Sequence, residues 1–253
     1  MSDPPRPDDL TGRVRAWWDA DAATYDDSSD HGWAAASPAL RAAWNAALHR
    51  LLPAPPSRVL DVGAGTGFLS LAAARLGHRV TALDVSGGML ERLRASAGRE
   101  GLTVEAVQAA AEEPPPGPFD AVVERHLLWT LPDPGAALAA WRAVAPGGRL
   151  VLFEGLWGAA DQVEALRGQA REQLRRLRGE PDHHHDRYDP AVLEALPLAG
   201  GTHPDRVVEL VEGAGWGPAR LERLRDIEWA QLLGLAPSAR LLGVTPRFAV
   251  VAG

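Results

Sequence analysis

The chain has 253 residues, 46% of them hydrophobic and 23% charged, a composition typical of a globular protein. Its formal net charge of −7 argues against a nucleic-acid partner, because binding to phosphate groups needs clustered cationic side chains. The absence of cysteine excludes disulfides, thiolate metal sites and cysteine nucleophiles. The absence of lysine excludes a Schiff-base enzyme and a Walker-type phosphate loop.

The expected location follows from the hydropathy pattern. No apolar run reaches the roughly 18 residues that a membrane-spanning helix needs. The first ten residues have neither the basic nor the apolar region of a signal peptide. We therefore expect a cytoplasmic protein without a membrane partner.

The N-terminal part is predicted to contain two helices. Residues 1–10 are rich in proline and acidic side chains, so we expect a disordered tail. Thr11 is suited to cap a first helix, in which Val14 and Trp18 recur at helical spacing. A second helix is predicted over 38–52, because proline fits the first turn and apolar residues form one stripe.

The middle of the chain alternates between short apolar runs and helical patterns. Strands are predicted at 58–62, 79–84, 103–108, 119–124 and 149–154, and helices at 68–76, 88–97 and 134–145. Such alternation is typical of βαβ units, which form a parallel sheet covered by helices on both faces. Ligands of such sheets bind beyond the carboxyl ends of the strands.

The alternation stops after Glu154. Helices are predicted at 161–178, 191–196 and 204–214, followed by strands at 220–229 and 247–251. We expect the segment 155–203 to be a helical insertion over the open end of the sheet. Residues 11–253 are then a single domain.

A glycine-rich turn is the sharpest local signal. The segment Val59-Leu60-Asp61-Val62-Gly63-Ala64-Gly65-Thr66-Gly67 is a strand that leads through three glycines into a helix. Such a turn lets the backbone approach a ligand closely, and dinucleotide-binding enzymes also have one. Here, however, Phe68 stands where the dinucleotide pattern has a small residue, and Asp61 would repel a pyrophosphate while attracting an ammonium group.

This segment resembles the first motif of class I S-adenosylmethionine-dependent methyltransferases, and the resemblance continues for about 100 residues. It implies an α/β fold: a Rossmann-like, doubly wound, seven-stranded sheet whose last strand is antiparallel. The cofactor implied is S-adenosyl-L-methionine, with S-adenosyl-L-homocysteine as product. The acceptor implied is a small organic molecule, and residues 11–52 match the helical lid of the ubiquinone-biosynthesis-like, small-molecule group.

The resemblance also assigns the cofactor-binding residues. Asp84, which lies 21 residues after Gly63, matches the acid that holds the ribose hydroxyls, and Met89 matches the residue that packs on adenine. Ala110 replaces the aspartate that commonly contacts the adenine amino group. The full predicted set is Tyr25, Asp61, Gly63, Ala64, Gly65, Gly67, Asp84, Val85, Met89, Ala111, Glu112 and Arg125, with Tyr25 closing over the methionine end.

Two residues are candidates for proton removal from the acceptor. His126 follows the fourth strand, a position that the resemblance places at the methyl end of the cofactor, and Glu154, at the end of the fifth strand, is the second choice. His126 could instead be a buried histidine bonded to the backbone. Glu154 could instead bind the charge of an amine substrate.

Aromatic side chains of Trp33, Trp129, Trp157 and Tyr188 are expected around the pocket and favour a flat acceptor. The run His183–His185 is attributed to a polar loop, because consecutive residues cannot all face one metal ion, so no metal is expected. Two alternatives stay open: a nicotinamide-dependent Rossmann oxidoreductase and a non-catalytic protein that binds S-adenosylmethionine. The sequence leaves open the acceptor, the methylated atom and the oligomeric state, for which a homodimer is the commonest arrangement.

Overall fold

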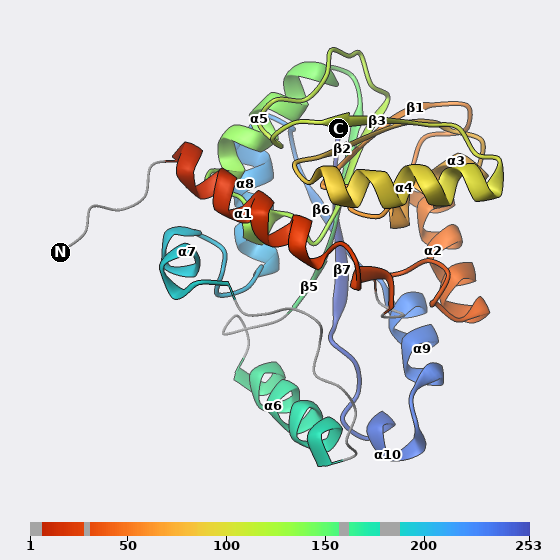
Figure 1. Cartoon of the computed structure of the whole chain (residues 1–253), viewed down its shortest axis with the longest axis vertical. Coiled ribbons are helices and arrows are strands. Elements are labelled where there is room, and N and C mark those ends of the chain that lie inside the picture. The colour runs from red at the N-terminus through yellow and green to blue at the C-terminus, as the bar shows by residue number, and fades with distance from the viewer. Residues whose placement is uncertain (1–6, 28–30, 157–161, 178–187) are drawn as a thin grey trace.

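The computed structural model describes residues 7–27, 31–156, 162–177 and 188–253. Figure 1 shows a central sheet with helices packed on both sides. The strands are β1 (Arg58–Val62), β2 (Arg79–Asp84), β3 (Val104–Gln108), β4 (Ala121–Arg125), β5 (Arg149–Gly155), β6 (Arg220–Arg223) and β7 (Arg247–Ala252). The helices are α1 (Pro7–Asp21), α2 (Pro38–Leu51), α3 (Phe68–Arg75), α4 (Gly87–Glu100), α5 (Pro134–Val144), α6 (Gln162–Leu177), α7 (Pro190–Ala195), α8 (Pro204–Gly213), α9 (Arg225–Gly234) and α10 (Pro237–Arg240), with short 3-10 turns η1 (Tyr25–Asp27) and η2 (Leu128–Thr130).

The sheet has the strand order β3-β2-β1-β4-β5-β7-β6. Strands β1 to β5 pair in parallel, whereas β7 is antiparallel to both β5 and β6. The expected Rossmann-like fold with an antiparallel last strand is therefore confirmed. The order reverses between β1 and β4, and this reversal opens a crevice at the carboxyl ends of the strands.

Helices cover both faces of the sheet. Successive side chains of a strand point to opposite faces, so each strand supplies residues to both. One set, which includes Val59, Val123 and Phe153, packs under α2, α3 and α9. The opposite set, which includes Leu60 and Leu152, packs under α5 and α8. This arrangement explains why the strands are almost continuously apolar.

The N-terminal helices differ in how well the sequence predicts them. The first helix begins at Pro7, not at Thr11, and Leu10 is buried, so the prediction of a tail through residue 10 is wrong for residues 7–10. The second helix matches its prediction closely, with Ser37 accepting the Leu40 N–H as a cap.

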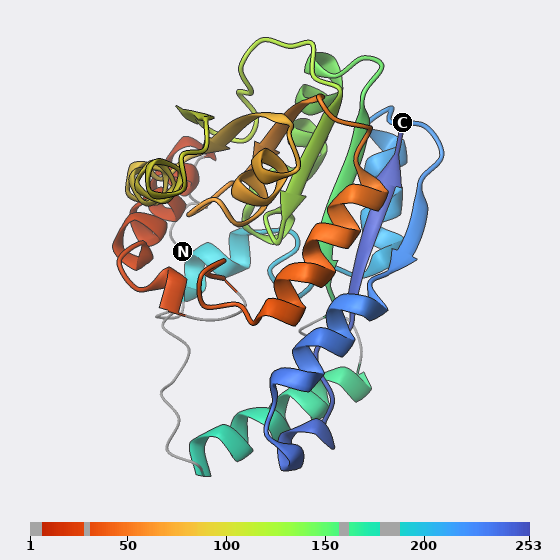
Figure 2. The same cartoon turned by 90° about the vertical axis from the view of Figure 1, so that its right-hand side faces the viewer.

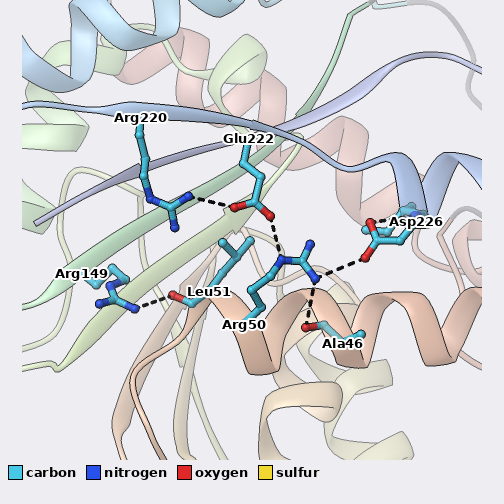
Figure 3. Close-up of polar contacts among 8 residues, drawn as sticks. Ala46, Arg50, Leu51, Arg149, Arg220, Glu222 and Asp226 are labelled. Atoms are coloured by element: carbon cyan, nitrogen blue, oxygen red, sulfur yellow. Dashed lines mark hydrogen bonds and ion pairs between the residues drawn. The ribbon is translucent and has the colours of Figure 1, made fainter.

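The end of α2 is tied to the C-terminal part of the chain by an exposed polar network (Figure 3). The Arg50 guanidinium contacts Glu222 Oε1 at 2.8 Å and Asp226 Oδ2 at 3.3 Å, while Arg220 contacts the second oxygen of Glu222 at 2.8 Å. Arg149 donates to the Leu51 carbonyl at 3.1 Å.

The prediction of a strand over 220–229 is wrong beyond Arg223. Residues 225–234 form α9, which buries Ile227 and Ala230 against the α2 side of the core. The period-2 pattern of β6 ends at Leu224, whose buried side chain begins a helical spacing with Ile227.

The segment 155–203 divides into two parts. Helix α7, with Tyr188, packs on Leu10 and Val14 of α1, close to the sheet crevice. Helix α6 lies with α10 beyond one end of the sheet (Figure 2), and Arg171 donates to the Leu242 carbonyl there. Both parts therefore lie on the side of the sheet to which the carboxyl ends of the parallel strands point, and α7 is the part that packs on α1.

Candidate functional site

A pocket of about 740 Å³, including its part open to solvent, lies at the carboxyl ends of β1, β2 and β4. Ten of the residues predicted from sequence line it: Tyr25, Gly63, Gly65, Asp84, Val85, Met89, Ala111, Glu112, Arg125 and His126. The predicted residues Asp61, Ala64, Gly67 and Glu154 do not line it. The size and the mostly apolar lining suit a small organic ligand.

The glycines of the β1–α3 turn serve two purposes. Gly63 and Gly65 have φ angles of 65° and 55°, in the left-handed region, and their backbone lines the pocket. A Cβ atom on Gly63 would stand 2.7 Å from Leu127 Cδ1. A Cβ atom on Gly67 would stand 2.8 Å from Leu93 Cγ of α4, so the small size of this glycine serves helix packing and not the pocket.

Asp84 connects the first two strand ends. Its Oδ2 accepts the Gly65 N–H at 2.7 Å, and its Oδ1 accepts the Ser86 N–H at 2.8 Å. Burial raises the pKa of Asp84 to about 6, although both backbone hydrogen bonds oppose this. Each carboxylate oxygen keeps a second acceptor position, so Asp84 is equipped to receive hydroxyl donors from the pocket.

Asp61 lies behind the glycine turn, with only 2% of its surface exposed. Its Oδ2 accepts the Ser70 hydroxyl at 2.5 Å, and burial raises its pKa to about 7. Ala64 is buried beside it and donates its N–H to the Leu83 carbonyl at 3.0 Å. The acid therefore lies next to the pocket wall without lining the pocket itself.

The opposite end of the pocket is formed by Met89 and the loop after β3. Met89 is buried, and its N–H is capped by the Ser86 hydroxyl at 3.1 Å. The Ala111 carbonyl accepts the Trp141 indole N–H at 2.7 Å, which fixes the loop. Burial raises the pKa of the neighbouring Glu112.

Helix α1 covers the pocket. Thr11, Val14 and Trp18 line it, and the sequence placed all three in the expected lid without naming them as binding residues. The Tyr25 ring stacks on His31 at a centroid distance of 4.4 Å and meets Trp18 edge-on at 5.8 Å.

Asp19 attaches α1 to the rest of the site. Its Oδ1 accepts the Ser86 hydroxyl at 2.5 Å and the Gly88 N–H at 3.1 Å, at the start of α4. The acid thereby lies at the positive end of a helix dipole, which stabilises the cover.

The aromatic residues predicted around the pocket lie elsewhere. Trp33 packs on Phe68 at 5.2 Å, and Trp129 packs on Tyr188 at 5.4 Å, and none of the three predicted residues Trp33, Trp129 and Tyr188 lines the pocket. Trp157 lies outside the described residues. The aromatic lining comes instead from Trp18 and Tyr25.

His126 stands at the inner end of the pocket in contact with two buried charged groups. Its Nδ1 lies 3.4 Å from Glu154 Oε2, and its Nε2 contacts the Arg247 guanidinium. Burial, followed by the charges of Arg247 and Arg125, lowers the pKa of His126 well below its ordinary value. Thr202 donates to the same oxygen of Glu154 at 3.2 Å, and burial raises the pKa of Glu154 to about 8.

Glu124 and Arg247 were not predicted as site residues. Glu124, at the β4 end, accepts the Leu127 N–H at 2.8 Å, and burial and then Glu154 raise its pKa well above the ordinary value. A charged residue that ends the apolar run of β4 is a sequence signal for it. No comparable signal exists for Arg247, because its position depends on the antiparallel pairing of β7 with β5.

Within the described ranges, no group of three or more histidines and carboxylates could hold a metal ion. The run His183–His185 lies outside these ranges. None of the helices that the structure describes is long and apolar enough to span a bilayer.

Comparison with known proteins identifies the family. A family model described as a methyltransferase domain matches residues 60–152. A ubiquinone biosynthesis O-methyltransferase of Xanthomonas euvesicatoria is 33% identical over 180 residues, which are 68% of this chain and 74% of the relative. Its counterpart in Xylella fastidiosa strain 9a5c is 33% identical over 191 residues, or 72% and 75% of the two chains.

Solved structures agree on the fold. A magnesium protoporphyrin IX methyltransferase from Synechocystis PCC 6803 with bound S-adenosylhomocysteine has a TM-score of 0.61 at 14% identity, covering 97% of this chain and 100% of that chain. A Burkholderia thailandensis 1,6-didemethyltoxoflavin-N1-methyltransferase has a TM-score of 0.59 at 20% identity, covering 100% and 92%.

These matches reject the nicotinamide-dependent alternative. The glycine turn, the acid at the end of β2 and the pocket between them all fit an adenosyl amino acid, since they offer close backbone approach and an acceptor for a diol. The chain belongs to the class I S-adenosylmethionine-dependent methyltransferases, and S-adenosylmethionine is its methyl donor.

Proposed function

We propose that the enzyme methylates a small organic molecule bound beside His126. The observation that carries this proposal is the course of the pocket, which runs from Glu112 and Asp84 to His126 under the cover of α1. The cover comes from Thr11, Val14 and Trp18 and leaves a site of small-molecule dimensions.

The donor is assigned to the half of the pocket near β1 and β2. Asp84 would accept hydrogen bonds from the ribose hydroxyls, and Met89 and Val85 would pack on the adenine, whose polar edge would meet Ala111 and Glu112. Gly63, Ala64 and Gly65 would let the amino-acid part approach the backbone, while Gly67 fixes the turn. Asp61 would attract the ammonium group through its charge, and Tyr25 and Arg125 would enclose the methionine end.

The acceptor is assigned to the half near β4 and β5. S-adenosylmethionine supplies an electrophilic methyl group on a sulfonium, so the protein must align the acceptor, exclude water and accept its proton. His126 is the proposed base, and Glu154 orients its ring from the Nδ1 side. The buried surroundings keep the imidazole uncharged and able to take a proton.

We propose a hydroxyl group on a flat ring as the methylated group. The relatives at 33% identity are O-methyltransferases by name, and a base at the inner end of the pocket suits a proton-bearing oxygen. Trp18 and Tyr25 offer aromatic surface to a flat acceptor.

The test combines binding and transfer. Calorimetry with S-adenosylhomocysteine should show uptake, and labelled-methyl transfer should occur to members of a panel of phenols, catechols and amines. His126→Ala should lower turnover at least tenfold while product binding persists. Wild-type turnover in this variant would remove His126 from the mechanism, and binding without transfer to any small molecule or extract fraction would favour a non-catalytic role.

A further inference from the structure

His126 has a backbone conformation that few residues adopt without compensation. Its φ angle is 59°, and it is the one non-glycine residue with a positive φ in the described part of the chain. The left-handed conformation is unfavourable for a residue with a side chain. Its backbone N–H donates to the Phe153 carbonyl at 3.1 Å, which links the strained position to β5.

The strained backbone aims the ring between a buried carboxyl and a buried guanidinium. Nδ1 lies toward Glu154, of which 1% is exposed, and Nε2 toward Arg247, of which 8% is exposed. The two partners lie on neighbouring strands, since Arg247 pairs with Gly155 across β5 and β7. Both ring nitrogens are therefore engaged at once.

Helix α9 holds Arg247 in place. Its backbone N–H donates to Glu228 Oε1 at 2.8 Å, and its Nε donates to Gln231 Oε1 at 3.0 Å. Both acceptors belong to α9, the helix that the sequence did not predict. The backbone and Nε of Arg247 are therefore held by α9, independently of the histidine that its Nη1 contacts.

The hydrogen-bonding inventory decides where the proton of His126 lies. A guanidinium has only donors, so the Nε2 that it contacts must present its lone pair. A neutral imidazole carries one proton, which must then be on Nδ1 and directed at Glu154 Oε2. A second ring proton on Nε2 would be placed directly against the guanidinium of Arg247.

We propose that Arg247 is a positioning residue for methyl transfer: together with Glu154 it holds His126 as the uncharged tautomer protonated on Nδ1. This inference rests on the proposed role of His126 as base. The acceptor oxygen then gives its proton to the lone pair of Nε2, once the Nη1 end of Arg247 moves aside while its backbone N–H and Nε keep their bonds to α9. The guanidinium remains beside that oxygen and favours its negative charge as the proton leaves.

Several charged groups face the ring and determine its response to pH. Arg125, Arg247 and His31 all oppose a charge on His126, whereas Glu154, whose pKa burial raises to about 8, faces the ring with a carboxyl that is mostly uncharged below that pH. Burial has the largest effect and also opposes the charge. Removing the Arg247 cation while Glu154 stays should therefore move protonation of His126 upward in pH.

The decisive measurement is nitrogen NMR of the full chain labelled with ¹⁵N-histidine, with the His126 signals assigned by their loss in His126→Gln. In the wild type we expect one protonated Nδ1 and one lone-pair Nε2, unchanged between pH 5.5 and 8. Arg247→Met should free Nε2 to carry the ring proton and should let the ring protonate at a higher pH than in the wild type, and Arg247→Lys, which retains a cationic donor, should restore the wild-type pattern at least in part. Arg206→Gln, which removes an exposed guanidinium on α8, should change nothing.

Turnover gives the second readout. The kcat/KM of Arg247→Met should fall at least tenfold below the wild type at pH 6 and recover as the pH rises, while binding of S-adenosylhomocysteine stays within about twofold. A wild-type ring that is charged or protonated on Nε2 would overturn the proposal. An unchanged ring spectrum in Arg247→Met would also overturn it. If Arg247→Met does not fold, the proposal is overturned by an Arg247→Lys variant in which the His126 ring titrates like free histidine. The NMR results hold without any acceptor, so failure to find methyl transfer would count against the proposed function alone.

Discussion

Replacing Asp61 by Asn measures how much the buried charge of this carboxyl destabilises the fold of the ligand-free protein. The carboxyl is 2% exposed, and burial raises its pKa from 3.8 to about 7. This difference corresponds to about 4 kcal/mol, since one pKa unit is about 1.4 kcal/mol. The amide is uncharged, and its oxygen is able to accept the Ser70 hydroxyl that Asp61 accepts at 2.5 Å.

The sign follows from proton linkage. The folded protein keeps the Asp61 proton up to about pH 7, whereas the unfolded chain loses it near pH 3.8, so wild-type stability falls as the pH rises between these values. The penalty on the wild type is about 2 kcal/mol at pH 5 and about 4 kcal/mol at pH 8. The stability of Asp61→Asn relative to wild type should therefore increase by about 2–3 kcal/mol from pH 5 to pH 8.

Urea denaturation of the ligand-free protein at both pH values measures this quantity, because a difference between two pH values cancels any constant packing effect of the amide. Asp205→Asn, whose parent side chain is 86% exposed, serves as the control for the change of charge. Stability differences that are the same at pH 5 and pH 8 would refute the reasoning about the buried acid. The same variant should bind S-adenosylhomocysteine more weakly at pH 8, because the charge that attracts the ammonium group is gone.

Three further substitutions test the turn, a helix position and the surface. In thermal unfolding, Gly63→Ala should lower stability by about 1–2 kcal/mol, because its φ is 65° and its new Cβ would meet Leu127 at 2.7 Å. It should also weaken cofactor binding. Gly98→Ala, in open space within α4, should instead raise stability by about 0.5–1 kcal/mol in the same assay. Arg50→Ala should lower stability by less than about 1 kcal/mol, because its pairs with Glu222 and a second acid are exposed. A larger loss by urea denaturation would show that this network is cooperative.

The fold was predictable because its signals are local. Each of the first five strands is a short apolar run followed by a turn or helix signal, and the glycine turn after β1 specifies one backbone path. Asp84, the acid at the end of β2, could be identified from its distance of 21 residues from Gly63 in that turn. Parallel βαβ units then fix which strand ends meet, and ten of the predicted site residues line one pocket.

What could not be predicted depends on contacts between distant segments. Arg247 reaches His126 only because β7 turns back against β5, with Arg247 opposite Gly155. Trp33 is an aromatic residue of the kind expected around a pocket, yet its ring packs on Phe68. The start of α1 at Pro7 is stabilised by the burial of Leu10 on the α7 segment, and tertiary packing of this kind overrides the local preference of a proline-rich stretch.

Because Asp61 and Asp84 are buried, we expect ligand binding to be coupled to the release of protons from them. A cationic ligand group placed near Asp61 lowers the free energy of its charged form, so binding should drive off the proton that the free protein holds below about pH 7. Calorimetry with S-adenosylhomocysteine in buffers of different ionisation enthalpy should thus show release approaching one proton at pH 6 and almost none at pH 8.5. Affinity should fall as the pH drops below 7, by at most about tenfold per pH unit for a single group.

Asp84 is the competing source of such protons, because its pKa is about 6 and it is the proposed partner of the ribose. Asp61→Asn separates the two, since any release that remains in this variant must come from groups other than Asp61. If release above pH 6.5 persists undiminished in Asp61→Asn, the first strand's acid is not the group that senses the ligand's positive charge. In that case the buried carboxyl stabilises the turn through Ser70 alone, and the attraction of the donor must come from elsewhere in the pocket.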